Sequence, residues 1–393
     1  MKKSTVIIIP QKEYNENIIY KKLSAAIDSL GGLGNFVKKE DNILVKPNFL
    51  SPSEADSSTV THPEVIRAVV HLLSDFGCNN VKYGDSPGHG TCKAAADKLG
   101  LTPENTFGAK LTPMNEEHYT EFADGMTAKE FHFTKEVVEA DAIINVCKMK
   151  THALETITGA VKNVYGYICG LKKAAGHVKY PNASVFARML ADIHRCTNTS
   201  LHIMDGIVAM EGNGPGSGTP TPMNVILVSS DPVAVDTVFC HLVDVNPELI
   251  PTNAQGAAMG IGTMNADEIE LRIIEEAESG SYRAAPAELS AIVSEFGNPE
   301  YDVDRVKKKK TFLSRFSSFM TGFQRKPYID GKECIKCGIC VNHCPVPGKA
   351  VDFTNGKDKP PVYDYNKCIR CYCCQEMCPK SAIKVKGSKR RKS

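Results

Sequence analysis

From residue 1 to about residue 300, the chain alternates short apolar, β-branched runs with longer amphipathic segments. Each apolar run is too short for a buried helix and is bounded by turn residues, which predicts a strand. The predicted strands are STVIIIP (4–10), DNILVKP (41–47), NNVKYGD (79–85), ADAIINVCK (140–148), SLHIMDG (200–206) and MNVILVS (223–229). This order of strands and helices predicts an α/β fold, with a mostly parallel sheet and helices on both faces.

Two of the helices between these strands have recognisable ends. Thr61 is expected to cap a helix that carries Pro63 in its first turn and stops at Gly77. Asp231, followed by Pro232, is expected to open a second helix. Both helices are rich in apolar residues, so they are expected to pack on the sheet.

The pattern changes near residue 300, which places the α/β domain at residues 1–304. The segment 305–327 has four consecutive lysines and then an apolar helical stripe, formed by Phe312, Leu313, Phe316, Phe319, Met320 and Phe323. We expect a basic amphipathic linker helix there, which either packs on its own protein or docks on a membrane surface or a partner. A cysteine-rich domain is expected at 328–386 and a basic tail at 387–393.

Bulk composition narrows the class of protein. With 393 residues and 42% hydrophobic content, the chain can bury a core without disulfides. Its formal charge of +2 gives no general reason to bind nucleic acid, and only four apolar residues precede Pro10, too few for a signal segment or a membrane span. We therefore expect a cytoplasmic protein. Nine of the fifteen cysteines lie in the last sixty residues, which in a reducing compartment favours metal ligation over disulfides.

The last sixty residues repeat one cysteine pattern, C-x2-C-x2-C-x3-C-P. The first copy consists of Cys334, Cys337, Cys340 and Cys344-Pro345, and the second of Cys368, Cys371, Cys374 and Cys378-Pro379. Such a run supplies the four thiolates of a 4Fe-4S cluster. The C-x2-C pairs also suit zinc, but two complete sets that both end in Cys-Pro favour iron and sulfide.

This stretch resembles the bacterial two-cluster ferredoxins, over about residues 328–386. The resemblance implies a small α+β domain in which the fourth cysteine of each run serves the other cluster. Cluster one is then held by Cys334, Cys337, Cys340 and Cys378, and cluster two by Cys368, Cys371, Cys374 and Cys344. The first half has a two-residue insertion after its proline, and Cys373 is an additional thiol without an assigned role.

Polar residues gather at the predicted strand ends of the α/β domain. They are Lys46, Asn48, Asp85, Ser86, Lys148, Lys150 and His152, with Lys162 and Asn163 at a helix start and Asp205 and Glu211 farther on. In an open α/β sheet, ligands bind beyond the carboxyl ends of the strands, where these residues are expected to meet.

The residue types at these ends suggest two kinds of ligand. The lysines, with Asn48, Asp85, Ser86, Asn163 and glycine-rich loops, suit an anionic substrate or cofactor. His152, Asp205 and Glu211 are candidate catalytic residues, as proton donors or as ligands of a further divalent metal. The alternative is that the glycines only form tight turns, since GNGPGSG is neither a Walker loop nor a G-x-G-x-x-G after a strand.

At the same positions the chain resembles the family catalogued as domain of unknown function 362. The resemblance is carried by VKPN, THPEVIRAVV, GDSPG, CKMKTH, TGAVKNVYG, DGIVAMEGNGP and DPVAVDTV, and it spans nearly all of residues 1–300. It implies a cytoplasmic iron-sulfur protein whose α/β domain has no settled activity, so it assigns no catalytic residue.

Three hypotheses about function follow. The first is a ferredoxin-fused oxidoreductase, in which low-potential electrons move to or from a small anion held in the α/β domain. The second is an electron-transfer adaptor whose α/β domain only docks a redox partner protein. The third is a redox sensor that engages nucleic acid through the tail, but no helix-turn-helix or aromatic-interleaved basic patch supports specific nucleic acid binding. The oligomeric state stays open.

Overall fold

A ten-stranded sheet forms the centre of the α/β domain in the computed structural model, which describes residues 3–170, 172–305 and 325–385. The strand order is β12-β11-β1-β10-β9-β7-β2-β3-β4, with β8 paired to β7. The strands are β1 (Ser4–Pro10), β2 (Ile43–Pro47), β3 (Val81–Tyr83), β4 (Lys110–Leu111), β7 (Ala142–His152), β8 (Thr156–Thr158), β9 (Thr199–Glu211), β10 (Thr219–Ser229), β11 (Ile269–Glu276) and β12 (Tyr282–Ala287). Strands β9, β7, β2, β3 and β4 are parallel, whereas β10 and β12 run antiparallel to their neighbours. The predicted α/β class with a mostly parallel sheet is confirmed.

Helices cover both faces of the sheet, because successive side chains of a strand point to opposite faces. In β1, Ile7 and Ile9 pack into a core with α1 and α2, whereas Val6 and Ile8 pack into a second core with α8. The helices are α1 (Glu16–Ser29), α2 (Pro63–Phe76), α3 (Cys92–Lys98), α4 (Lys135–Glu139), α5 (Ala160–Asn163), α6 (Lys172–Lys179), α7 (Ala183–Cys196), α8 (Pro232–Leu242), α9 (Pro251–Ala258) and α10 (Leu289–Phe296). A separate hairpin is formed by β5 (Glu117–Glu121) and β6 (Glu130–Thr134).

All six predicted strands are present, but β10 begins four residues before its predicted start, and two other strands continue past their predicted ends. Strand β7 continues through Lys148 and Lys150 to His152, and every residue in it is buried. Strand β9 continues through Asp205 to Glu211. Charged residues normally end a buried strand, but here the ion pair and hydrogen bonds described below satisfy the buried charges.

The predicted helix ends are confirmed with one correction. Gly77 caps α2 in a left-handed conformation (φ 90°), and Asp231 caps α8 through a 2.8 Å hydrogen bond from the amide of Ala234. The expected Thr61 cap was wrong. His62 caps α2, accepting from the amide of Glu64, because the Thr61 hydroxyl already donates to the Val146 carbonyl.

The cysteine-rich domain, called the module below, is built from two similar halves. Its elements are β13 (Pro327–Ile329), α11 (Ile339–Asn342), β14 (Val351–Asp352), β15 (Val362–Tyr363), α12 (Cys373–Glu376) and β16 (Ile383–Val385). Left-handed residues precede both short helices at matching positions, Lys336 and Gly338 in one half and Arg370 and Tyr372 in the other. The sequence repeat is therefore also a repeat of backbone shape.

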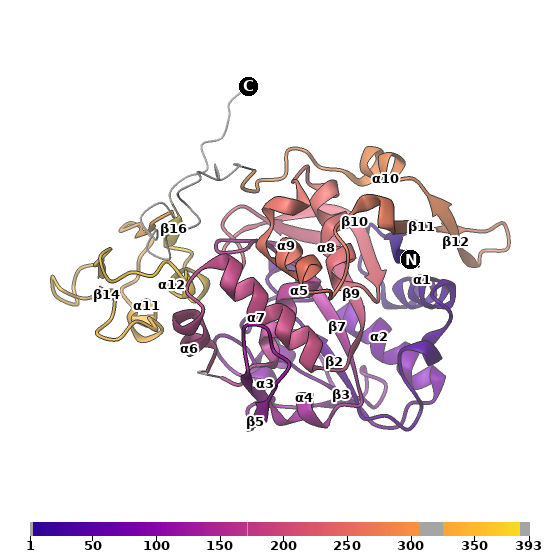
Figure 1. Cartoon of the computed structure of the whole chain (residues 1–393), viewed down its shortest axis with the longest axis horizontal. Helices are drawn as coiled ribbons and strands as arrows, with labels where there is room; N and C mark the ends of the chain where they lie inside the picture. The colour runs from indigo at the N-terminus through magenta and orange to yellow at the C-terminus, as the bar shows by residue number, and fades with distance from the viewer. Residues whose placement is uncertain (1–2, 171, 306–324, 386–393) are drawn as a thin grey trace.

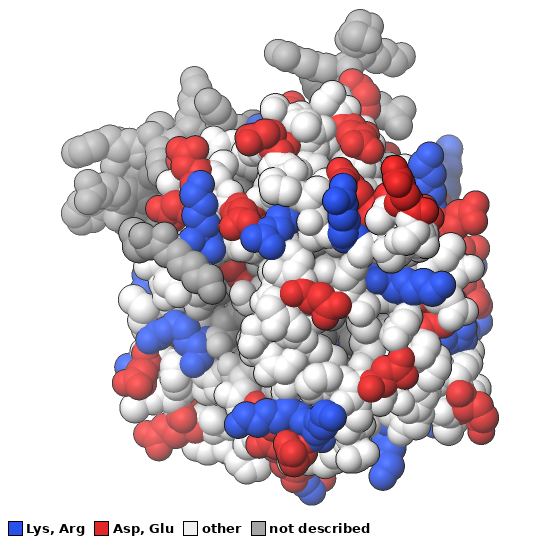
Figure 2. All heavy atoms as spheres, turned by 90° about the vertical axis from the view of Figure 1, so that its right-hand side faces the viewer, with Lys and Arg blue, Asp and Glu red and all other residues white. Residues whose placement is uncertain are grey.

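The module lies against one side of the α/β domain, on the side away from α1 and β12 (Figure 1). Figure 2 shows the face on the α1 and β12 side, where basic and acidic side chains are interspersed without a block of either sign. The predicted tail 387–393 and most of the predicted linker helix, 306–324, lie outside the described residues. Within the described ranges, no helix has both the length and the apolarity needed to cross a bilayer.

Candidate functional site

Four cysteines from both halves of the module meet around one small cavity. Its lining includes Cys334, Cys337 and Cys340 from the first half and Cys378 from the second. Their closeness also appears in the pKa of Cys340, which burial and then the three neighbouring thiols raise to about 11. The structure thus brings together the residues that the sequence assigned to cluster one, and four converging thiols suit an iron-sulfur cluster.

The other four cysteines form a second group beside the first. Burial, and then the neighbouring Cys371 and Cys344, raise the pKa of Cys368. The Cys374 sulfur accepts a 3.0 Å hydrogen bond from the hydroxyl of Tyr363, and its thiol interacts with both Cys368 and Cys340. The two groups therefore adjoin at Cys340 and Cys374. All fifteen cysteines are free of disulfides.

Backbone amides reach the fourth sulfur of each run. Ala350 donates to the Cys344 sulfur and Ala382 to the Cys378 sulfur, both at 3.3 Å. The first donor lies six residues after its cysteine and the second lies four, so the two-residue insertion lengthens the loop and preserves the contact. Hydrogen bonds of this kind tune the potential of an iron-sulfur cluster.

Helix α12 seats the module on the α/β domain. Gln375 Nε2 donates to the carbonyl oxygens of Asn213 (2.8 Å) and Gly214 (3.1 Å). The side-chain amide of Asn213 in turn donates from Nδ2 to the backbone carbonyl of Ile383 in β16. Gly88 lies close to the module, because a methyl group there would come within 2.8 Å of the Met377 side chain. The half of the module that holds Cys373 and Cys374 therefore faces the α/β domain.

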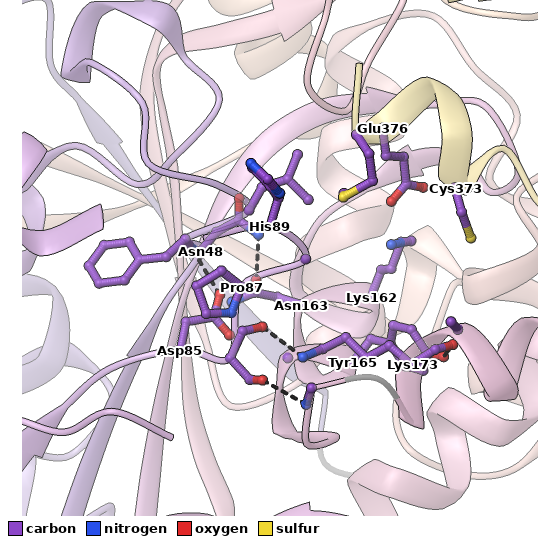
Figure 3. A pocket seen from close by; sticks show the side chains of 18 of the residues that line it. Asn48, Asp85, Pro87, His89, Lys162, Asn163, Tyr165, Lys173, Cys373 and Glu376 are labelled. Atoms are coloured by element: carbon purple, nitrogen blue, oxygen red, sulfur yellow. Dashed lines mark hydrogen bonds between the residues drawn. The ribbon is translucent and has the colours of Figure 1, made fainter. Parts of the chain in front are cut away.

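A cavity of about 350 Å³ lies between the two domains (Figure 3). The α/β domain lines it with polar groups from Lys46, Asn48, Asp85, Ser86, Lys162, Asn163 and Lys173, and the module with Cys373, Glu376, Met377 and His343. Phe49, Leu50, Pro87 and Tyr165 add apolar wall. This combination of apolar lining and a few converging polar groups is typical of a small-molecule site.

Two lysines give the cavity its positive charge. Lys162 extends toward Glu376 and Cys373 of the module (Figure 3), and its ammonium makes no hydrogen bond or close ion pair with any described residue. Lys173 is half-buried and donates 2.7 Å to the carbonyl of Ser86. Burial lowers the pKa of Lys173 to about 7, opposed by Asp85. The cavity wall therefore carries these two ammonium groups together with the carboxylates of Asp85 and Glu376.

A buried polar network supports the cavity floor. Lys46 Nζ lies 3.1 Å from Asp85 Oδ1 and donates to the Asn163 side chain at 2.9 Å. Asn48 also donates to Asn163, and its own oxygen accepts 2.7 Å from Lys150. Lys46, Asn48 and Asn163 thus face the cavity at fixed positions, whereas Lys150 lies behind them.

Three of the predicted site residues lie elsewhere. Lys148 and Asp205 form an ion pair at 2.7 Å with both side chains fully buried, and Tyr14 bonds to both. Glu211, at the end of β9, accepts from the amide of Asp302. Among the residues described, no three His, Cys, Asp or Glu side chains form a single-ion site, so His152, Asp205 and Glu211 are not brought together.

His152 lies at the junction of the two domains. Its Nδ1 accepts from the amides of Leu154 and Glu155, and its Nε2 lies 3.0 Å from Glu376 Oε1. Burial, with a further effect from Lys162, lowers the pKa of His152 to about 4, so the ring is neutral at pH 7. Its contact is with the module, and it fixes Glu376 at the cavity wall.

Several cavity residues carry no strand-end motif in the sequence. Lys173 and His177 come from α6, a segment with no strand end to mark it, and Glu376 and Met377 lie inside the cysteine pattern. The basic character of LKKAAGHVK, four residues after the TGAVKNVYG motif, was the available signal for α6. No pattern in a single chain indicates that the module closes this cavity.

Comparison with known proteins identifies both parts of the chain. The model of a domain of unknown function (DUF362) matches residues 43–241, just over half of the chain. A thylakoid-associated protein of Synechocystis sp. is 33% identical over 265 residues, which cover 67% of this chain and 82% of that protein. The chain belongs to the DUF362 family.

A 4Fe-4S dicluster domain matches residues 326–385 of this DUF362 protein. The predicted ferredoxin-type module is thereby confirmed, and the chain is an iron-sulfur protein with an electron-transfer domain. Neither the family description nor the thylakoid-associated relative states an activity for the α/β domain.

Two solved structures match parts of the chain. The lactate racemase apoprotein of Thermoanaerobacterium thermosaccharolyticum is 15% identical with a TM-score of 0.39, over 60% of this chain and 56% of that one. A Thermotoga maritima protein is 14% identical with a TM-score of 0.31, over 72% of this chain and 57% of that one. The DUF362 chain thus spans little more than half the length of either structure.

The cavity floor depends on Gly166, which lies against Lys46 and Asp85. A methyl group at Gly166 would collide with the Asp85 carboxylate and the Lys46 ammonium. We expect Gly166→Ala to lower the free energy of unfolding by about 1–3 kcal/mol, measured by urea denaturation under anoxic conditions. Gly34→Ala, whose methyl group meets only Phe76 at 3.5 Å, is the matched control. If both substitutions lower the free energy of unfolding equally, the Lys46–Asp85 pair does not depend on its close contact with Gly166.

Proposed function

We propose that this protein is an oxidoreductase that moves low-potential electrons between its module and a small organic anion held in the cavity. The observation that carries the proposal is the position of the cavity, whose wall includes both the Lys162 ammonium and Cys373, the neighbour of Cys374. A group bound there lies beside a proposed cluster ligand and beside an available positive charge. We place the protein in the cytoplasm, since its fifteen free cysteines suit a reducing compartment.

We propose that the module holds two clusters with crossed ligands. Cluster one takes Cys334, Cys337, Cys340 and Cys378, and cluster two takes Cys368, Cys371, Cys374 and Cys344. The convergence of the first four thiols on one cavity supports this assignment. Bound 4Fe-4S clusters supply single electrons at low potential.

The residues of the chain bind and orient the anion. Lys162 and Lys173 attract an acidic group, and the apolar side chains of Leu50, Met377 and Phe49 exclude water from the rest of the ligand. A two-electron reduction of the bound anion consumes two electrons from an external donor protein and two protons from solvent, and the oxidation returns both. No group in the cavity has to change its own oxidation state.

The adaptor hypothesis makes a different prediction for the same cavity. A domain that only docks a partner enzyme needs a complementary surface and has no use for an enclosed site with an available lysine. The cavity therefore favours the enzyme.

The test uses anoxically purified protein with both clusters reduced by dithionite. It is mixed with a panel of reducible organic anions, including 2-oxo acids, enoates and aryl carboxylates, while cluster reoxidation is followed by absorbance. We expect at least one class to reoxidise the clusters, with an affinity that falls about 10- to 100-fold in Lys162→Met. Lys172→Met, which removes an exposed lysine paired with Glu117, is the matched control. Equal affinities in both variants would contradict the proposal.

Anion binding is expected to weaken as pH rises through 7. Lys173 has a pKa of about 7, so it is charged below this pH and neutral above it. His177 adds no charge in this range, because burial lowers its pKa to about 4. Benzoate, which stays ionised throughout, should bind up to about tenfold more weakly at pH 8.5 than at pH 6.

Measuring benzoate affinity at both pH values in two variants separates the effect of Lys173 from that of nearby groups such as Asp85, Lys46 and Cys169. Lys173→Arg keeps its charge and should bind benzoate equally at both pH values. Lys173→Met should bind weakly at both. A pH dependence that persists in Lys173→Arg would assign the effect to another group.

A further inference from the structure

The two cysteine groups of the module differ in exposure. Cys337 of the first group is exposed, whereas Cys344 and Cys374 of the second are buried, and Cys373, next to Cys374, lines the cavity. The cavity around the first group is also lined by Ile335, Lys336, Pro379 and Lys380. Cluster one is thus the cluster that another protein can approach, and cluster two is the one beside the cavity.

The surface over cluster one has an apolar centre. The Ile335 side chain is 56% exposed, and Val362, which follows Pro361 of the same cavity lining, is 44% exposed. Large apolar side chains with this exposure are few among the described residues, and two of them lie in this small module. We call this surface, formed by Ile335, Lys336, Val362 and Lys380, the outer face.

The charges of the outer face are basic. Lys336 and Lys380 are both exposed, and neither forms an ion pair with any residue that the structure describes. The nearby acidic residues Asp330 and Glu333 are both engaged by Lys384, at 3.7 and 3.1 Å. Residues 326–385 contain ten Lys and Arg against six Asp and Glu. The surface toward the α1 and β12 side is instead mixed in sign (Figure 2).

We propose that the outer face is the docking site of a small acidic redox protein that exchanges electrons with cluster one. Charge complementarity selects an acidic partner, and the exposed Ile335 supplies the apolar contact at the centre. Each encounter oxidises the partner by one electron and reduces the module by one, or the reverse. Two encounters supply the two electrons that the proposed reduction of the cavity anion consumes.

The order of the groups in the structure supports a route from this face to the cavity. Cys340 of the first group interacts with Cys374 of the second, and Cys373 next to it lines the cavity. An electron that enters at the outer face therefore crosses the module before it reaches the bound anion. The inference rests on the cluster assignment of the proposed function, and it requires no particular anion.

The experiment measures reduction of the full-length, cluster-loaded protein by a reduced acidic flavodoxin, followed by stopped-flow absorbance without any organic anion. We expect the bimolecular rate to fall as salt increases from 50 to 500 mM, which is the sign of attraction. The double variant Lys336→Glu with Lys380→Glu should be reduced at least about tenfold more slowly at low salt. Its iron content should stay within twofold of the wild type.

Two further variants control the result. Lys93→Glu with Lys98→Glu changes the net charge equally on exposed α3 positions and should leave the rate within twofold. Lys336→Gln with Lys380→Gln leaves the cysteine loops with neutral side chains and should give an intermediate rate. A wild-type rate that rises with salt, or equal rates in the two Glu variants, would overturn the inference. Because no anion is present, such a failure would leave the cavity proposal standing, and a failed Lys162 test would leave this one standing.

Discussion

Replacing Cys378 by alanine is expected to abolish the cluster bound by the first cysteine run, although Cys378 belongs to the second. Its thiol shares a cavity with Cys334, Cys337 and Cys340. Iron should fall from about eight to about four atoms per chain in anoxically purified protein. The electron paramagnetic resonance spectrum of reduced Cys378→Ala should match that of reduced Cys334→Ala. The spectrum of reduced Cys344→Ala should likewise match that of reduced Cys371→Ala.

Cys373→Ala is the matched control for these variants, because Cys373 adjoins Cys374 without belonging to either proposed ligand set. It should retain about eight irons. If Cys378→Ala instead resembles Cys368→Ala, each run holds its own cluster, and the crossed assignment is wrong. Loss of iron in Cys373→Ala would make that thiol a ligand.

The second large effect is on stability. Asp205→Ala removes the 2.7 Å ion pair and leaves the buried Lys148 ammonium with the Tyr14 hydroxyl as its one hydrogen-bond partner among the described residues. Breaking a buried pair from one side costs about 3–5 kcal/mol. We expect a loss of this size in the free energy of unfolding, measured by urea denaturation under anoxic conditions.

Removing the lysine is expected to cost less. In Lys148→Met, the Asp205 carboxylate still accepts hydrogen bonds from the Tyr14 hydroxyl and the amides of His62 and Ile207. Lys93→Met, which removes an exposed lysine paired with Asp97, should change the stability by less than about 1 kcal/mol. If Asp205→Ala costs no more than Lys93→Met, the pair does not stabilise the fold.

The sequence predicted the features that local patterns determine. Apolar runs such as STVIIIP became strands, because alternate side chains of β1 are needed in two different cores. The caps at Gly77 and Asp231 follow from backbone and side-chain chemistry within a few residues. The cysteine runs are equally local, since three of the four thiols come from one loop. The domain boundaries at 304 and 328 stay predictions.

The differences arise where distant residues meet. Lys148 and Lys150 were expected at a strand end, but the strand continues through them, because Asp205 of β9 pairs with Lys148 and Asn48, which follows β2, accepts from Lys150. Asp205 is 57 residues from Lys148, so no window of sequence shows the pair. Asp205 pairs with Lys148, and Glu211 accepts from the amide of Asp302, so the two carboxylates have different partners. Their roles as proton donors or metal ligands stay predictions.

The candidate site shows the same limit. Lys46, Asn48, Asp85 and Asn163 meet as predicted, because the carboxyl ends of neighbouring parallel strands lie together. Lys173 and Glu376 could not be predicted. The first becomes part of the site through a loop bond to Ser86, and the second through the docking of the module. Docking depends on shape complementarity between two domains, which periodicity does not encode.

We propose that an organic anion binds beside cluster two, held by Lys162. The most direct measurement is pulsed electron-nuclear double resonance on the reduced protein with benzoate carrying a ¹³C-labelled carboxylate, and with inorganic phosphate as a second probe. We expect ¹³C or ³¹P coupling to cluster two in the wild type. This coupling should be lost in Lys162→Met and retained in Lys172→Met. Absence of coupling for both probes in the wild type, or coupling that survives in Lys162→Met, would contradict it.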